Sequence, residues 1–229
     1  MDNALIRKLI AEFLGTFTLV LVGSFAVAAT GIPQSSANVV VPALAHGLVL
    51  VGIIFAYGHI SGAHFNPAVT VGLLVGRKID PISAVAYIIT QFVGGIVAAV
   101  VLSALLPDRF NFGVTKGMLT DTNVWQAAGI EAILAFLLVS TIYQAAVYGK
   151  AGNNAPIAIG FTLAALICAT GMFTGASINP ARTLGPALIA GDLSYVVPYF
   201  VGLFAGGAVG GLVHGYVLND TTEKVKANS

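Results

Sequence analysis

The feature that most constrains this chain is a series of long apolar runs almost free of charged residues. An α-helix rises about 1.5 Å per residue, so about twenty residues cross the roughly 30 Å hydrocarbon core of a bilayer. Of the 229 residues, 57% are hydrophobic and only 8% are charged, which is too few for an ordinary water-facing surface. Six runs are long enough to span a membrane: Ile6–Ala29, Val39–Gly58, Ala84–Leu106, Val124–Tyr148, Ala155–Phe173 and Tyr195–Leu218.

All six runs are expected to be helices, because lipid offers no partner to an unpaired backbone N–H or C=O. The sequence therefore predicts an all-α membrane protein that forms one domain over residues 1–229. Its formal net charge of +1 excludes the strongly basic surface typical of nucleic-acid-binding proteins. The first run is too long for a removable signal peptide, and no convincing cleavage site follows it.

The basic residues indicate the orientation of the chain, because cytoplasmic loops carry an excess of Lys and Arg. Seven basic residues fall on one side of the membrane: Arg7, Lys8, Arg77, Lys78, Lys150, Lys224 and Lys226. The third connection, on the other side, carries Arg109 and Lys116. Both termini are therefore predicted to be cytoplasmic, and the plasma membrane is the expected location.

Two further stretches do not fit six continuous spans. One runs from His59 through Asn-Pro-Ala to Val75, and the other runs from Thr174 through Asn-Pro-Ala-Arg to Ala190. Each has room for about nine or ten helical residues after its Asn, which is roughly half a membrane. Asn before Pro predicts an N-cap followed by the first helical residue. Two half-helices that meet tip to tip would complete a seventh, composite span.

The chain also repeats itself. Each half, about 6–106 and 124–218, contains three spans, one Asn-Pro-Ala box and one intramembrane glutamate, Glu12 or Glu131. Three is an odd number, so the second half must enter the membrane upside down relative to the first. Inverted repeats with broken helices place a translocation path between the halves, near the middle of the membrane.

These paired boxes resemble the aquaporin family, as do Gly58-His-Ile-Ser-Gly-Ala-His-Phe-Asn-Pro-Ala-Val-Thr70 and Ala11-Glu-Phe-Leu-Gly-Thr16. The resemblance extends from Arg7 to about Leu218. It implies six transmembrane helices plus two half-membrane re-entrant helices in an inverted repeat, one pore per subunit and a homotetramer in the lipid bilayer. The second box and the residues after it are most similar to water-channel and tonoplast-type members. The box residues are Asn66, Pro67, Ala68, Asn179, Pro180 and Ala181.

The resemblance also gives roles to polar residues inside the membrane. Asn66 and Asn179 would point amide donors into the pore, where two positive helix ends repel a transferring proton. Glu12 and Glu131 are interpreted as structural carboxylates that accept hydrogen bonds from the non-helical backbone, and Gln91 as a brace in the same region. The expected ladder of backbone carbonyls along the pore comes from Gly62, Ala63, His64, Gly175, Ala176 and Ser177.

By the same resemblance, the selectivity filter consists of His46, Ile167, Ala176 and Arg182. Arg182 is a charge within an apolar stretch, which is costly and by default functional. Strict water channels of the family usually have Phe on the second helix and His on the fifth. Glycerol facilitators have Trp on the second helix and Asp directly after the arginine, where this chain has Thr183. The combination found here resembles tonoplast-type aquaporins that also pass ammonia.

The prediction is thus a passive channel for water, and for ammonia or other small neutral solutes, that excludes protons and ions. The alternatives are a strict water channel and, less favoured, a glycerol or urea facilitator. A cation channel or proton-coupled transporter would need acidic rings or a carboxylate relay along the path. An intramembrane enzyme is disfavoured, since neither Gly-x-Ser-x-Gly nor His-Glu-x-x-His occurs.

No cofactor or metal is expected. His59 and His64 are poorly spaced for a metal and lack an evident third ligand. Cys168 is expected to be a small buried side chain. Lys116, in the loop above the pore, is a candidate to approach the filter.

Overall fold

The computed structural model describes residues 3–30, 39–108 and 113–219, and these residues form helices and turns only. Six helices are long and apolar enough to cross a membrane, and two are half that length, which confirms the predicted fold class. The long helices are α1 (Asn3–Thr30), α2 (Val40–Ser61), α4 (Pro81–Leu105), α6 (Val124–Ile142), α7 (Ala155–Thr174) and α9 (Val196–Leu212). The half-length helices are α3 (Pro67–Val75) and α8 (Pro180–Ala190). Shorter elements are α5 (Met118–Thr122), η2 (Tyr143–Val147), η3 (Gly152–Asn154) and η4 (Val213–Val217).

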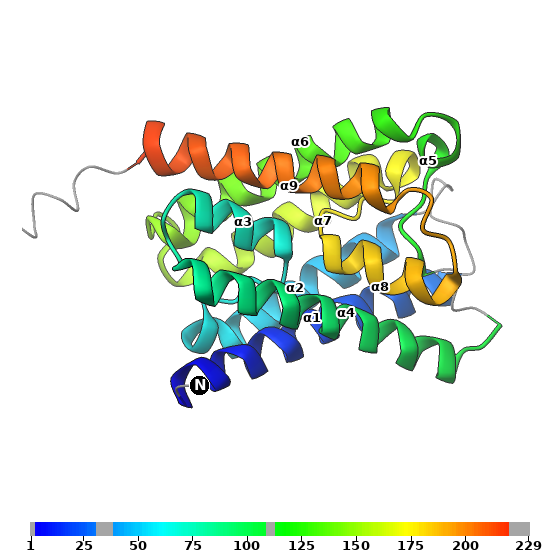
Figure 1. Ribbon diagram of the computed structural model, residues 1–229, viewed down its shortest axis with the longest axis horizontal. Coiled ribbons are helices and arrows are strands. Elements are labelled where there is room, and N and C mark those ends of the chain that lie inside the picture. The colour runs from blue at the N-terminus through cyan, green and yellow to red at the C-terminus, as the bar shows by residue number, and fades with distance from the viewer. Residues whose placement is uncertain (1–2, 31–38, 109–112, 220–229) are drawn as a thin grey trace, which may run out of the picture.

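The helices pair in a pattern that repeats between the halves. Helix α1 packs on α4 as α6 packs on α9, and α3 packs on α9 as α8 packs on α4. Helices α2 and α7 pack on each other. The half-helices α3 and α8 lie between the long helices and enter from opposite ends of the bundle (Figure 1). The described structure therefore has the arrangement of an inverted repeat.

Glycines bring the helix backbones into contact where the halves cross. A Cβ added at Gly47 of α2 would lie 2.6 Å from the carbonyl oxygen of Gly160, and one added at Gly160 would lie 2.4 Å from that of Gly47. A Cβ at Gly207 of α9 would lie 2.3 Å from the carbonyl oxygen of Ala68, at the tip of α3. Contacts this short leave no room for any side chain, as is typical of membrane helices that pack through small residues.

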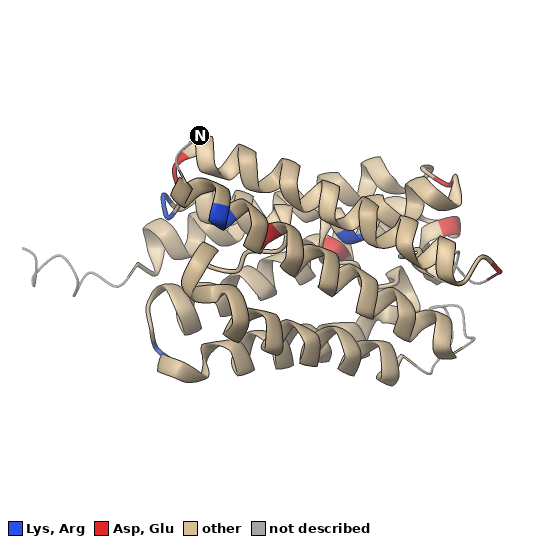
Figure 2. Cartoon of the chain, turned by 90° about the horizontal axis from the view of Figure 1, so that it is seen from below, with Lys and Arg blue, Asp and Glu red and all other residues tan. Residues whose placement is uncertain are grey.

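Few charged residues lie along the length of the bundle (Figure 2), and many large apolar side chains are exposed. Among the described residues, the buried Asp, Glu, Lys and Arg side chains are Glu12, Glu131 and Arg182. The prediction that Cys168 is buried is wrong, because it is exposed on α7. Ile167 faces the interior, and one further residue turns the side chain by about 100° around the helix. Cys168 therefore points away from the bundle.

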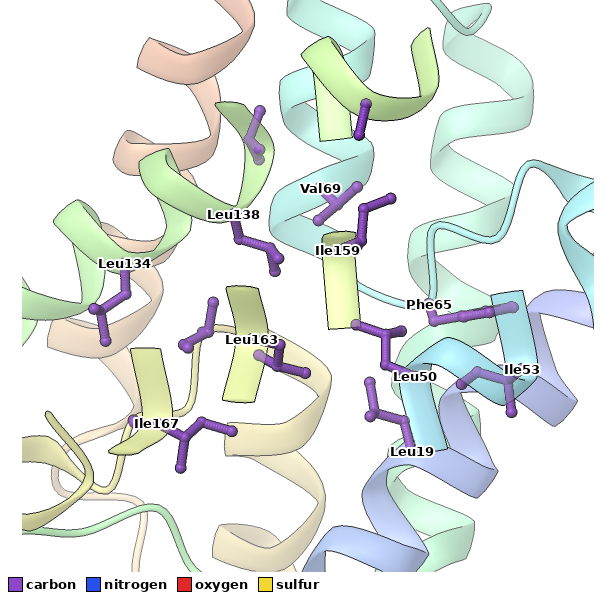
Figure 3. Packing of buried hydrophobic residues seen from close by; sticks show 14 of the residues in the cluster. Leu19, Leu50, Ile53, Phe65, Val69, Leu134, Leu138, Ile159, Leu163 and Ile167 are labelled. Atoms are coloured by element: carbon purple, nitrogen blue, oxygen red, sulfur yellow. The ribbon is translucent and has the colours of Figure 1, made fainter. Parts of the chain in front are cut away.

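A cluster of buried hydrophobic side chains, most of them aliphatic, occupies the space between α1, α2, α3, α6 and α7 (Figure 3). The cluster does not fill this space completely, because some of its members form one wall of the cavity described below. These are Leu19, Leu50, Val69, Leu138, Ala155, Ile159, Leu163 and Ile178.

The crossing of α2 and α7 yields a stability prediction. Gly47→Ala should destabilise the protein by about 1–3 kcal/mol, because the new methyl group has no space beside Gly160 and Ala164. Gly52→Ala on the same helix is the matched control, since an added Cβ there has nothing within 4 Å and should leave stability unchanged or slightly higher. Thermal unfolding in detergent would compare the two variants. An equal loss in both would contradict the assigned crossing.

Candidate functional site

Each half-helix begins at the Asn-Pro pair of its box. Asn66 has extended backbone angles (φ −157°, ψ 120°), and its Oδ1 accepts a hydrogen bond from the Ala68 N–H at 2.9 Å. Asn179 is similar (φ −147°, ψ 115°), and its Oδ1 accepts from Ala181 at 2.9 Å and from Arg182 at 3.4 Å. The following prolines occupy the first helical position, where a missing N–H costs no helix bond. Both asparagines are therefore N-caps.

The same two asparagines join the tips of the half-helices. Asn66 Nδ2 donates to the Ile178 carbonyl at 2.8 Å, and Asn179 Nδ2 donates to the Phe65 carbonyl at 2.9 Å. Each amide nitrogen carries two hydrogens. One is used in this reciprocal contact, and the other remains available on the side of the cavity that both residues line.

The backbone before each cap adopts left-handed angles that recur in both halves. Non-glycine residues rarely take positive φ, at a cost of roughly 1–3 kcal/mol each, and such angles are least expected for a β-branched residue. The repetition of this strain indicates that both half-helices need it. The φ angles are 88° at Gly62, 54° at Ala63, 51° at Phe65, 78° at Gly175, 42° at Ala176 and 58° at Ile178.

The two intramembrane glutamates hold these strained segments. Glu12 accepts hydrogen bonds from the backbone N–H of His64 at 3.0 Å and of Phe65 at 2.8 Å. Glu131 accepts from the backbone N–H of Ser177 at 2.9 Å and of Ile178 at 2.8 Å. All four N–H groups lie outside helices and would otherwise be unpaired. Each carboxylate thus fixes the backbone directly before one half-helix.

Four side chains beyond those predicted from the sequence complete these contacts. Ser61 donates to Glu12 at 2.6 Å, and Thr174 donates to Glu131 at 2.7 Å. Tyr87 donates to the Ser61 carbonyl at 2.8 Å, and Tyr199 donates to the Thr174 carbonyl at 2.7 Å. Ser61 and Thr174 had a visible signal, since each is followed by Gly-Ala ahead of its box. The tyrosines lie on distant helices and had none.

Gln91 gives the first half a contact that the second half lacks. Its Nε2 donates to Glu12 at 2.7 Å and to Thr70 Oγ1 at 3.0 Å. Thr70 also contacts the His64 ring nitrogen Nδ1 at 3.1 Å. Leu203 on α9 stands at the position that matches Gln91, and it is fully buried. Glu12 is therefore held by one more donor than Glu131.

The structure brings His46 and Arg182 together. Arg182 Nε donates to His46 Nε2 at 3.3 Å, while His46 Nδ1 lies 2.7 Å from the Pro42 carbonyl. A carbonyl can only accept, so Nδ1 carries the proton and Nε2 is the acceptor. Arg182 Nη1 also donates to the Gly113 carbonyl. A Cβ at Gly23 would fall 2.0 Å from His46 Nε2, so a glycine on α1 makes room for the ring.

Ile167 and Ala176 are both buried, each with a relative exposure of 5%, and both belong to the apolar cluster. Neither lines the cavity that His46 and Arg182 line. Among the expected carbonyl positions, Gly62, Ala63, His64 and Ser177 line that cavity, whereas Gly175 and Ala176 are buried outside its lining.

The cavity encloses about 70 Å³, which is room for at least two water molecules at roughly 30 Å³ each. Part of its lining is polar, with the two box asparagines, His46 and Arg182. Much of the rest is aliphatic and comes from the cluster in Figure 3. A small polar solute would thus find hydrogen bonds from only part of the lining.

Residues 2–214 match the family model described as major intrinsic protein. The chain is 38% identical to "Aquaporin TIP2-3" of Arabidopsis thaliana, over 96% of this chain and 91% of that protein. It is 39% identical to "Probable aquaporin TIP2-2" of Oryza sativa subsp. japonica, over 93% and 88% respectively. The X-ray structure of the aquaglyceroporin from Plasmodium falciparum has the same fold, with a TM-score of 0.77, 24% identity and coverage of 93% of this chain and 97% of that one.

The relatives named above are tonoplast-type aquaporins, so they do not support the expected location in the plasma membrane. The six apolar helices and the aquaporin relatives support an integral membrane protein with several spans. The family match over nearly the whole chain shows that this protein belongs to the major intrinsic protein family, the aquaporins, which are membrane channels rather than enzymes.

Proposed function

We propose that the protein is a passive channel that conducts water and ammonia and excludes protons and other ions. It works in a lipid bilayer as a homotetramer, with one pore per subunit and both termini in the cytoplasm. The observation that carries the proposal is the cavity lined by the half-helix tips, which combines polar donors and carbonyl positions with aliphatic side chains.

Water conduction follows from that lining. A water molecule at the tips accepts hydrogen bonds from the second amide hydrogens of Asn66 and Asn179, which replace bonds it made in bulk water. The aliphatic wall offers it no further partner, so the molecule is not held strongly. Because few bonds must be broken in each step, crossing has a low activation energy, close to that of diffusion in free water.

Proton exclusion follows from the same two amides. A water whose oxygen accepts from both asparagines has its own hydrogens directed away from them, which interrupts the chain of hydrogen bonds along which a proton would move. The positive ends of α3 and α8 both point to this place and raise the energy of any cation. Glu12 and Glu131 do not provide a relay, since their oxygens are engaged by backbone and side-chain donors.

Ammonia permeation depends on the filter. Both ring nitrogens of His46 are committed, one to Pro42 and one to Arg182, so the ring holds the guanidinium on its own side of the path. By the resemblance, His46 stands where strict water channels have the bulkier Phe, and Ile167 and Ala176, which are buried outside the cavity lining, bring no polar group to the filter. A wider, partly apolar constriction suits a solute that is slightly wider than water and loses less on leaving solvent. Neutral NH₃ passes, and NH₄⁺ is rejected by Arg182 and the helix ends.

A first test reconstitutes the protein in vesicles. Water conduction should appear as fast shrinkage in an osmotic gradient, and ammonia conduction as faster lumenal alkalinisation of a pH dye in an ammonium gradient. Replacing His46 by Phe together with Ile167 by His should slow ammonia by roughly tenfold and spare water, because a narrower, more polar filter discriminates by size and hydrogen bonding. Water conduction with no ammonia flux above that of empty vesicles would leave a strict water channel.

A second test addresses Arg182. Arg182→Val removes the charge and the guanidinium's hydrogen bonds to His46 and to the Gly113 carbonyl, so water flux should survive while glycerol permeability rises roughly five- to tenfold. Arg182→Lys is the matched comparison, because it retains the charge and should still exclude cations. Light scattering with glycerol gradients and ion-leak assays separate the two variants. A folded Arg182→Val protein that conducts no water would refute the assigned role.

A further inference from the structure

Lys116, in the segment between α4 and α5, connects three parts of the molecule. Its Nζ donates to Asp192 Oδ2 at 2.8 Å, lies 2.6 Å from Asp121 Oδ1, and stands 5.7 Å from the centre of the Tyr195 ring. The Lys116 side chain is 25% exposed and that of Asp192 36%, so this pair is partly shielded from water. The partners of Lys116 are therefore carboxylates in α5 and beyond α8, rather than filter side chains.

Asp192 is itself fixed to the end of α8. Its backbone N–H donates to the Ala187 carbonyl at 3.0 Å, and its Oδ1 accepts from the Ser194 hydroxyl at 2.6 Å. The hydrogen bond from Lys116, followed by that from Ser194, lowers the pKa of the Asp192 carboxyl to about 2. The carboxylate is thus ionised at every pH at which the protein would work, and the ion pair is permanently available.

The segment that carries Lys116 also holds Arg182, through the Gly113 carbonyl. Its other end is seated on α7, where a Cβ at Gly117 would lie 2.4 Å from the carbonyl carbon of Phe173. The segment 113–117 therefore contacts α8 at both ends: the Arg182 side chain in the first turn, and Asp192 just after the last.

We propose that Lys116 is a positioning residue of the selectivity filter. Its ion pair with Asp192 keeps segment 113–117 aligned along α8, so that the Gly113 carbonyl holds the Nη1 side of the Arg182 guanidinium. His46 holds the Nε side. Without the ion pair, the segment shifts and one of these two hydrogen bonds of the Arg182 side chain is lost. The inference rests on the proposed function, because it assigns a role within the filter of a water-conducting pore.

The test uses vesicles that contain the full-length protein and measures the ratio of glycerol to water permeability. Lys116→Met should raise this ratio roughly two- to fivefold, the effect expected of a partly exposed ion pair, with little change in water flux. The double variant Lys116→Asp, Asp192→Lys should restore the original ratio, because it keeps one positive and one negative charge at these two positions. Lys78→Met is the matched control, since Lys78 is exposed and lies over the Tyr148 ring, away from the filter.

Ionic strength separates positioning from a merely structural role. Raising salt on both sides of the membrane from about 0.01 M to about 1 M shortens the Debye length from about 30 Å to about 3 Å. The ratio of glycerol to water permeability of the unmodified protein should rise toward that of Lys116→Met. The ratio of Lys116→Met should not change with salt. A ratio that is the same in Lys116→Met, Lys78→Met and the unmodified protein, with water conduction intact, overturns the inference alone. Absence of water conduction in the unmodified protein overturns the proposed function, and this inference with it.

If Lys116→Met does not assemble, Asp192→Asn and hydrogen exchange replace it. The backbone amides of residues 113–117 should exchange faster in Asp192→Asn than in the unmodified protein, because the end of the segment next to α8 is released. Unchanged exchange there would show that the ion pair does not hold the segment, and would overturn the proposal.

Discussion

The rest of the structure depends on satisfying the backbone of the two segments that precede the half-helices. A chain that stops being helical inside a membrane exposes N–H groups that lipid cannot bond, at several kcal/mol each. Glu12 and Glu131 each accept hydrogen bonds from two such groups and from a hydroxyl, and Glu12 accepts a further one from Gln91. Burying a carboxylate is costly, but each of its bonds to a donor is stronger than one between neutral groups. A glutamine in either place would turn an amide donor toward N–H groups, so the site requires an acid.

The inverted repeat separates what the fold needs from what selectivity needs. The carboxylates, the strained segments, the caps and the crossing glycines all occur in both halves. The two polar filter side chains do not, whereas Ile167 and Ala176 recur as Ile54 and Ala63. At the positions of the opposite half that match His46 and Arg182, the chain has Ile159 and Val69, and both line the aliphatic part of the cavity. The parts present in both halves thus form the frame of the path. His46 and Arg182 have no polar counterpart at the matching positions, so they add polar groups at one end of it.

The sequence was sufficient to predict elements that leave a local pattern. Span lengths, the Asn-Pro start of each half-helix and the paired glutamates were readable, because each follows from hydrophobic length or from chemistry at adjacent positions. Contacts between distant helices were not. Tyr87 and Tyr199 carry no motif, and the exposure of Cys168 depends on the rotation of α7, which an apolar run does not reveal. The bond between His46 and Arg182 depends on space left by Gly23, on a third helix.

Arg182 and Lys116 have different kinds of hydrogen-bond partner. The hydrogen-bond partners of Arg182 described above, His46 Nε2 and the Gly113 carbonyl, are neutral acceptors that orient the group without cancelling its charge. Two carboxylates, Asp121 and Asp192, are engaged by Lys116 instead. A direct pair with either would bind the guanidinium more strongly, but it would weaken the positive field that the proposed rejection of cations requires. Assigning the carboxylates to a lysine keeps the arginine both fixed in place and positive toward the path.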